Sequence, residues 1–150
     1  MPGVYYSTVL DAPIERVWDS IRNFNALADW HPLIVDCHIE ENQPSDRVGC
    51  VRNFRLEDGA NFRERLLSLN DLKKTFSYCI EEAPLPLENY VATVKLSPVT
   101  DGNRTFVSWS STFQCPPDAE QELSELVEDG VYRAGLEAIR KILDQGQTTS

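Results

Sequence analysis

Residues 33–113 contain six segments in which apolar and polar side chains alternate with a period of two, the pattern of half-buried β-strands. Turn-forming sequences separate the segments, among them QPSD at 43–46, DG at 58–59 and DGN at 101–103. Connections this short join antiparallel neighbours, so the pattern predicts an antiparallel meander. The predicted strands are residues 34–41, 48–56, 61–69, 73–81, 89–96 and 104–113.

A strand and two short helices are predicted before this meander. Aromatic and β-branched residues at 4–10 indicate the strand. Pro13 suits the first turn of a helix, because the N–H that it lacks has no partner there. A second helix is predicted over residues 24–30, and Pro32 ends it. The apolar face of the first helix consists of Ile14, Val17, Trp18 and Ile21.

One long amphipathic helix is predicted after the meander, from Pro117 to a basic end at Arg140 and Lys141. Only this helix is long enough to cover the apolar face of a sheet of seven strands. The predicted fold is therefore α+β: a curved seven-stranded antiparallel sheet wrapped around a long C-terminal helix, with two short helices after strand 1. Gly130 and Gly135 in this helix indicate either room for a cavity or a bend or close helix–sheet contact. The predicted apolar stripe consists of Leu123, Leu126, Val127, Val131, Ala134, Ala138, Ile139 and Ile142.

Length and composition fit one globular domain. The chain has 150 residues, 41% of them hydrophobic and 25% charged, which suffices to bury a core without disulfides or a metal. We expect a single domain over residues 1–143 and a disordered tail over residues 144–150. The formal net charge of −10 argues against a nucleic-acid partner and against binding to anionic membranes.

The cysteines and the first residues favour a cytoplasmic protein. Cys37, Cys50, Cys79 and Cys115 match no CxxC pattern, so we interpret them as reduced thiols. We expect no metal site and no cofactor. No apolar run reaches the ~20 residues that cross a bilayer, so no membrane insertion is expected. Residues 1–6 lack the basic and apolar regions of a secretory signal.

Two charged residues, Arg52 and Glu64, fall among apolar neighbours at positions that face the predicted core. If residues 57–59 form a three-residue hairpin loop with Gly59 in the left-handed conformation, Arg52 lies directly opposite Glu64. A two-residue loop would pair residues of opposite parity, so the faces would conflict. The sequence therefore predicts an inward-facing pair of opposite charges.

Three large polar aromatic residues share the inner face with this pair: Tyr78, Tyr90 and Trp109. A loop at residues 70–72 would place Tyr78 opposite Glu64. Because a dry core rarely accepts charged groups, this set favours a cavity that holds solvent or a small ligand. The alternative is a structural ion pair that fixes the strand register, with the tyrosines filling space.

An ordered set of motifs resembles the START/Bet v 1-like superfamily (SRPBCC), which includes polyketide cyclase/dehydrase and lipid-transport proteins. The resemblance covers residues 4–143 and implies the helix-grip fold, with an apolar cavity between the sheet and the last helix. The motifs are LDAPIERVW at 10–18, NFNALADWHP at 23–32, VGCVR at 48–52, ERL at 64–66, ENY at 88–90 and Trp109.

Two plant branches of the superfamily are similar to the chain in different ways. In the abscisic-acid receptors a lysine anchors the ligand carboxylate, and the matching position here is His31. Their gate loop is represented only by LEDGA at 56–60, and their His-Arg-Leu latch does not occur in residues 84–89. The lachrymatory-factor synthase-like group resembles GCVR at 49–52, ERL at 64–66, NYVAT at 89–93 and WSSTFQC at 109–115. That resemblance implies a proton-handling set of Arg52, Glu64 and Tyr90.

Three functions remain open. The first is binding of a small hydrophobic molecule with a polar end in an internal cavity. The second is a cofactor-free acid–base enzyme, an isomerase, cyclase or dehydratase, that uses Arg52, Glu64 and Tyr90. The third is a protein-interaction module, which would expose a large apolar patch. The candidate ligand-binding residues are Arg52, Phe54, Phe62, Glu64, Phe76, Tyr78, Tyr90, Trp109, Trp30, His31, Val127 and Val131.

The partner expected from these residues is a small apolar ligand, bound by a monomer or a homodimer. Residues 84–87 are apolar and turn-forming, so they form either a lid over the cavity entrance or a dimer contact. Serine and histidine nucleophiles are not indicated, since no serine lies in a GxSxG context and only two histidines occur.

Overall fold

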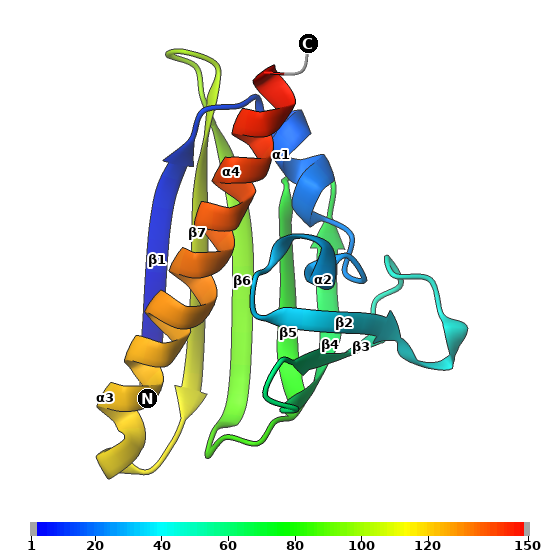
Figure 1. Ribbon diagram of the computed structural model, residues 1–150, viewed down its shortest axis with the longest axis vertical. Coiled ribbons are helices and arrows are strands. Elements are labelled where there is room, and N and C mark those ends of the chain that lie inside the picture. The colour runs from blue at the N-terminus through cyan, green and yellow to red at the C-terminus, as the bar shows by residue number, and fades with distance from the viewer. Residues whose placement is uncertain (1–2, 149–150) are drawn as a thin grey trace.

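The computed structural model describes residues 3–148 and contains a seven-stranded antiparallel sheet (Figure 1). The strand order is β1-β7-β6-β5-β4-β3-β2, so the six strands of the meander are neighbours in sequence order and β1 pairs with β7. The predicted antiparallel meander is therefore confirmed. The strands are β1 Gly3–Leu10, β2 Ile34–Ile39, β3 Val51–Leu56, β4 Asn61–Asn70, β5 Thr75–Glu82, β6 Glu88–Val99 and β7 Arg104–Gln114.

Three consecutive helical segments after β7 form one long rod that lies against the sheet (Figure 1). They are α3 Glu120–Glu125, the π-helical segment η3 Leu126–Arg133 and α4 Ala134–Thr148. The α+β helix-grip fold is confirmed by this arrangement. Within residues 3–148, no helix combines the length and the apolar character needed to cross a membrane. The remaining helical segments are α1 Ile14–Ile21, α2 Leu27–Trp30, and the 3₁₀ turns η1 Glu40–Asn42 and η2 Pro117–Ala119.

Helix α1 covers one end of the core and is tied to the turn between β4 and β5. Its predicted apolar residues Val17, Trp18 and Ile21 are buried. The indole Nε1 of Trp18 donates a hydrogen bond to Asp71 Oδ1 at 2.7 Å, and Arg22 pairs with the same carboxylate at 2.7 Å. These contacts hold the helix against the turn between β4 and β5.

The hairpin between β3 and β4 has the predicted register. Gly59 has a φ of +91°, and the N–H of Leu56 donates to the carbonyl of Ala60 at 2.9 Å, which closes a three-residue loop. Arg52 is paired with Glu64, and Phe54 with Phe62. The left-handed glycine therefore fixes which side chains of the two strands face each other.

The predicted register of the next hairpin is wrong by two residues. Glu64 lies opposite Ile80, and Tyr78 lies opposite Leu66. The turn occupies residues 71–74, with Lys74 in the left-handed region at φ 57°, and the ladder contains two register shifts. Because a shift of two residues preserves the side-chain face, Tyr78 still points inward as predicted.

The apolar stripe of the last helix differs from the prediction after Val127. A π-helical turn contains more residues than an α-helical turn, so the stripe continues at Tyr132 instead of Val131. Leu126 and Ile142, both expected in the stripe, are exposed, while Val131, Ala134 and Ala138 are half-buried. The buried residues are Leu123, Val127, Tyr132, Leu136, Ile139 and Leu143.

Several predicted boundaries are also wrong. Helix α2 begins at Leu27 instead of residue 24, because the side chain of Asn23 accepts the N–H of Asn25 in a turn. Strand β2 ends at Ile39, where η1 and its left-handed residues interrupt the extended chain. Helix α4 continues to Thr148, so residues 144–148 are not the disordered tail that we expected. Backbone hydrogen bonds prolong the helix beyond Leu143, which is buried. Residues 149–150 of that tail lie outside the described residues.

Close packing explains one of the two helical glycines. A Cβ on Gly135 would lie 2.9 Å from His31 Cδ2, 3.0 Å from Trp30 Cζ3 and 3.2 Å from Trp109 Cζ3. A Cβ on Gly130 would meet only the flexible end of Leu126, at 3.3 Å. Of the two explanations that the sequence left open for Gly135, the structure shows close contact with neighbouring side chains.

We therefore expect Gly135→Ala to destabilise the protein although alanine favours helices. Overpacking against the three rings should lower the free energy of unfolding by about 1–3 kcal/mol, measured by urea denaturation. Gly130→Ala is the matched control and should be neutral or stabilising by up to about 1 kcal/mol. Equal effects of the two substitutions would contradict this account of the packing.

Candidate functional site

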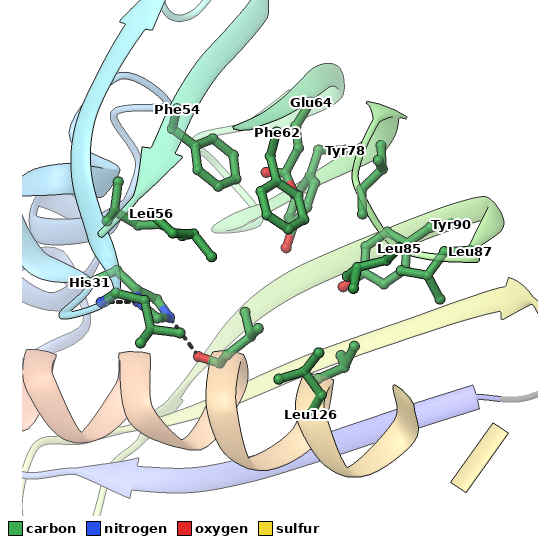
Figure 2. A pocket seen from close by; sticks show the side chains of 15 residues that line it. His31, Phe54, Leu56, Phe62, Glu64, Tyr78, Leu85, Leu87, Tyr90 and Leu126 are labelled. Atoms are coloured by element: carbon green, nitrogen blue, oxygen red, sulfur yellow. Dashed lines mark hydrogen bonds between the residues drawn. The ribbon is translucent and has the colours of Figure 1, made fainter. Parts of the chain in front are cut away.

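A cavity of about 100 Å³ lies between the inner face of the sheet and the helical rod (Figure 2). Its wall is mainly apolar. At its outer side Leu33 and Leu126 are 41% and 43% exposed, so the entrance lies beside these two residues. The lining residues are His31, Leu33, Ile34, Phe54, Leu56, Phe62, Glu64, Tyr78, Ile80, Leu85, Leu87, Tyr90, Leu126, Val127 and Val131.

The hairpin of β3 and β4 supplies both the aromatic and the charged part of this wall. The rings of Phe54 and Phe62 are stacked, with centroids 5.3 Å apart and planes 3° apart. One step deeper on the same face, Arg52 Nε and Nη2 both donate to Glu64 Oε1, at 2.9 Å and 2.6 Å. Arg52 and Glu64 are only 4% and 6% exposed, so the ion pair is shielded from water.

The surroundings of Arg52 hold it away from the cavity. Its guanidinium lies over the ring of Phe24 at 4.0 Å and over the ring of Tyr78 at 4.9 Å. Its Nη1 also donates to the carbonyl of Phe24, at 3.4 Å. Burial raises the pKa of the Glu64 carboxyl, and the neighbouring charge of Arg52 opposes this shift.

The structure divides the predicted site residues into two groups. Eight of them line the cavity: His31, Phe54, Phe62, Glu64, Tyr78, Tyr90, Val127 and Val131. The placement of the other four in the same cavity was wrong: Arg52, Phe76, Trp30 and Trp109 line a separate void of about 10 Å³. Strand parity identifies the face of a residue but not the depth at which its side chain ends, which is why these four were misplaced.

Seven lining residues were not among the predicted site residues: Leu33, Ile34, Leu56, Ile80, Leu85, Leu87 and Leu126. Signals for some of them were present. Leu56 shares a face with Phe54, and Leu85 and Leu87 lie in the apolar loop 84–87 that was predicted to be a lid or a dimer contact. Leu126 was assigned to the helix stripe, and the π-helical turn moves it to the rim of the cavity instead.

Two tyrosine hydroxyls belong to the inner part of the cavity. Tyr90 forms a short hydrogen bond with the hydroxyl of Tyr132, a fully buried residue that the sequence did not indicate. Trp109 Nε1 donates to the hydroxyl of Tyr78 at 3.0 Å. Burial raises the pKa of Tyr78, Tyr90 and Tyr132, so all three hydroxyls are neutral at physiological pH.

His31 links the segment before β2 to the helical rod. Its Nε2 donates to the carbonyl of Val131 at 2.9 Å, and its Nδ1 accepts the N–H of Leu33 at 3.2 Å (Figure 2). These two bonds define a neutral imidazole. Burial lowers the pKa of His31, and the positive charge of Arg52 lowers it further. His31 therefore lines the cavity with both ring nitrogens already bonded.

The arrangement can hold an apolar molecule and exchange hydrogen bonds with it at one end. Glu64 offers a carboxylate, while Tyr78 and Tyr90 offer hydroxyls, and the rest of the wall is hydrocarbon and aromatic rings. Among the residues that the structure describes, no group of His, Cys, Asp or Glu side chains has a metal-binding arrangement. All four cysteines are free thiols, and none of them lines the cavity.

A comparison with protein families agrees with this geometry. The family model for polyketide cyclase/dehydrase and lipid transport matches residues 1–144. The chain belongs to this family. Its fold places it in the Bet v 1-like superfamily that the sequence motifs resemble.

Individual relatives of this polyketide cyclase/dehydrase family protein come from plants and bacteria. It is 30% identical over 143 residues to the abscisic acid receptor PYL1 of Arabidopsis thaliana, a match that covers 90% of this chain and 64% of the receptor. The chain therefore spans just under two thirds of the length of that relative.

Among solved structures, the protein XoxI of Bacillus cereus is similar with a TM-score of 0.84 and 32% identity, over 95% of each chain. The Zhui aromatase/cyclase of Streptomyces sp. R1128 has a TM-score of 0.80 at 17% identity, over 96% of this chain and 94% of that chain. The second similarity shows the fold alone.

The buried ion pair of this family member gives a test of coupling. Arg52→Met and Glu64→Leu should each lower the free energy of unfolding by about 3–5 kcal/mol, because each leaves an unpaired buried charge. The double variant should be more stable than either single variant, measured by urea denaturation. Asp36→Asn, which removes the partner of the exposed Arg55, is the control and should hardly change the midpoint. Additive losses in the double variant would show that the pair is not coupled.

The neutral His31 gives a pH dependence of stability. Its pKa is lowered in the folded state, so the unfolded chain binds the proton more readily, and stability falls as the pH drops below about 6.5. Between about pH 7.5 and pH 5.5, the wild type should lose more unfolding free energy than His31→Gln, by at most about 1.4 kcal/mol per pH unit. His38→Gln alters an exposed residue of β2 and should behave like the wild type. Identical pH profiles for the wild type and His31→Gln would refute this role of the histidine.

Proposed function

We propose that the chain binds a small, mainly apolar molecule with one polar end in the cavity between the sheet and the helical rod. The observation that carries this proposal is the segregation of the cavity wall. Its inner part contains Glu64 and two tyrosine hydroxyls, whereas the entrance is bordered by leucines. Such a wall orients a ligand with its polar end inward and its apolar end outward.

The size of the cavity limits the ligand. A volume of about 100 Å³ is below the ~150 Å³ cavity known to hold benzene, and below the ~300 Å³ at which drug-sized pockets begin. A substituted benzene exceeds this volume, so its binding requires side-chain shifts around the cavity. A larger one requires displacement of the leucine side chains at the entrance, whose apolar groups are held by packing alone.

The relatives support a binding function but do not name this ligand. One relative is an abscisic acid receptor, which indicates that this type of domain can enclose a small organic molecule. In the receptor branch the carboxylate anchor is a lysine, and the matching His31 here is neutral and fully bonded. We therefore propose the binding of a small molecule without proposing abscisic acid as the ligand.

A second candidate function, an acid–base enzyme, is favoured by one observation. Glu64 is a buried carboxyl with a raised pKa, and Arg52 occupies only its Oε1. A carboxylate in this state is suited to taking a proton from a bound substrate. The two residues predicted to act with Glu64 are not free to do so in the same way. The hydroxyl of Tyr90 is bonded to that of Tyr132, and Arg52 lies behind the cavity wall. Arg52 is then a positioning residue for Glu64 instead of a contact of the substrate.

Filling the cavity tests the binding function. Toluene should bind the wild type and shift the amide NMR signals of residues that line the cavity. Val127→Trp should abolish this binding, because a larger side chain from the buried helix face occupies the volume. Leu72→Trp is the control, since Leu72 is 90% exposed in the turn between β4 and β5.

Unchanged binding in Val127→Trp, or shifts confined to residues outside the cavity, would overturn the proposal.

Native mass spectrometry of the purified protein separates the two candidate functions. A co-purified compound that is recovered unchanged after incubation supports a carrier. Its conversion by the wild type, but not by Glu64→Gln, supports the enzyme.

A further inference from the structure

The polar side chains of the cavity wall present free hydrogen-bonding positions at particular atoms. Glu64 uses Oε1 for both bonds from Arg52, and its Oε2 receives no hydrogen bond from any residue in the range 3–148. The hydroxyl of Tyr78 accepts from Trp109, and its own hydrogen has no acceptor within the described chain. Figure 2 shows Glu64 and Tyr78 next to each other on the inner wall. The wall therefore offers a strong acceptor, Glu64 Oε2, beside the neutral hydroxyl of Tyr78, while the hydroxyl of Tyr90 is bonded to Tyr132.

None of the described residues that line this wall carries a free positive charge. Arg52 is the nearest cation, but its guanidinium is bonded to Glu64 and to the carbonyl of Phe24. The rings of Phe24 and Tyr78 lie against its faces. His31, the other basic group at the cavity, is neutral because Nδ1 accepts a backbone N–H and Nε2 donates to a carbonyl.

We infer that the ligand of this cavity is an uncharged molecule whose buried end carries a hydroxyl group that donates a hydrogen bond to Glu64 Oε2. The inference rests on the proposed binding function and specifies the chemistry of the ligand. A hydroxyl oxygen can also accept a hydrogen bond, so a hydroxyl group has both the donor that Glu64 needs and an acceptor for a hydrogen such as that of Tyr78. Phenols, enols and alcohols on a compact apolar skeleton belong to this class.

Other polar ends fit less well for electrostatic reasons. A carboxylate would place a second negative charge beside Glu64 in a site shielded from water, where Arg52 is already paired. An ammonium group would approach Oε2 while Arg52 occupies Oε1 of the same carboxylate, so two positive charges would share one negative charge. An ether or ketone can accept from Tyr78, but it leaves the buried Oε2 without a donor, which carries a penalty.

A panel of probes on one skeleton tests the inference in the unmodified protein. The probes are p-cresol, 4-methylanisole, p-toluate, 4-methylbenzylammonium and p-xylene, titrated by NMR. A purely apolar cavity would prefer p-xylene, because p-cresol loses the hydration of its hydroxyl on binding. We expect p-cresol to bind at least as tightly as p-xylene, and about tenfold or more tighter than 4-methylanisole and p-toluate, since a hydrogen bond to a charged group is the stronger kind.

The substitution Glu64→Gln should change the order of affinities among these probes. Without the negative charge, the guanidinium of Arg52 is no longer neutralised, so the affinity for p-toluate should rise by about tenfold or more. The preference for p-cresol over 4-methylanisole should shrink at the same time, since a neutral amide oxygen accepts more weakly than a carboxylate. If Glu64→Gln does not fold, the comparison of p-cresol with 4-methylanisole in the wild type decides the question without any variant.

Failure of the inference is distinguishable from failure of the proposed function. If p-xylene binds in the cavity but p-toluate, 4-methylbenzylammonium or 4-methylanisole equals or exceeds p-cresol, the binding function stands and the assignment of a hydroxyl is wrong. If none of the probes, p-xylene included, binds in the cavity, the proposed function itself fails.

Discussion

The ion pair between Arg52 and Glu64 is the constraint on which the site depends. Both residues are buried, and both bonds run from the guanidinium to a single carboxylate oxygen. Two buried charges are compatible with a stable fold only when they form an ion pair. Arg52 and Glu64 can form this pair only in the register that the Gly59 turn imposes. The same register stacks Phe54 on Phe62. One hairpin therefore determines the polar base and part of the aromatic wall of the cavity.

The pair also separates positive from negative charge along the depth of the core. The guanidinium lies between aromatic rings behind the wall, and the carboxylate forms part of the wall itself. A ligand in the cavity meets the acidic partner and is shielded from the basic one. The electrostatic character of the site is thus set by the direction of the Arg52 side chain. The ring of Phe24, from the segment between α1 and α2, stabilises that direction.

Sequence patterns predicted the fold and the face of each strand well, because alternation and short turns encode both. They could not predict features that depend on an added residue or on side-chain direction. The shifts in the β4–β5 ladder moved the partner of Glu64 from Tyr78 to Ile80. The π-helical turn replaced Val131 by Tyr132 in the buried stripe and so introduced the partner of Tyr90. Neither irregularity leaves a signal in a search for regular periods.

The two walls of the cavity are held by different forces, and this difference bears on how a ligand enters. The sheet side is a set of paired strands joined by backbone hydrogen bonds, which resist local displacement. The helix side is held by side-chain packing and by a few hydrogen bonds that involve side chains, among them His31 to the carbonyl of Val131 and Tyr90 to Tyr132, and it contains the π-helical segment. Leu126 belongs to that segment and borders solvent. A ligand larger than the present cavity is therefore accommodated by movement of the helix and of the entrance leucines, while Glu64 stays in place on the sheet.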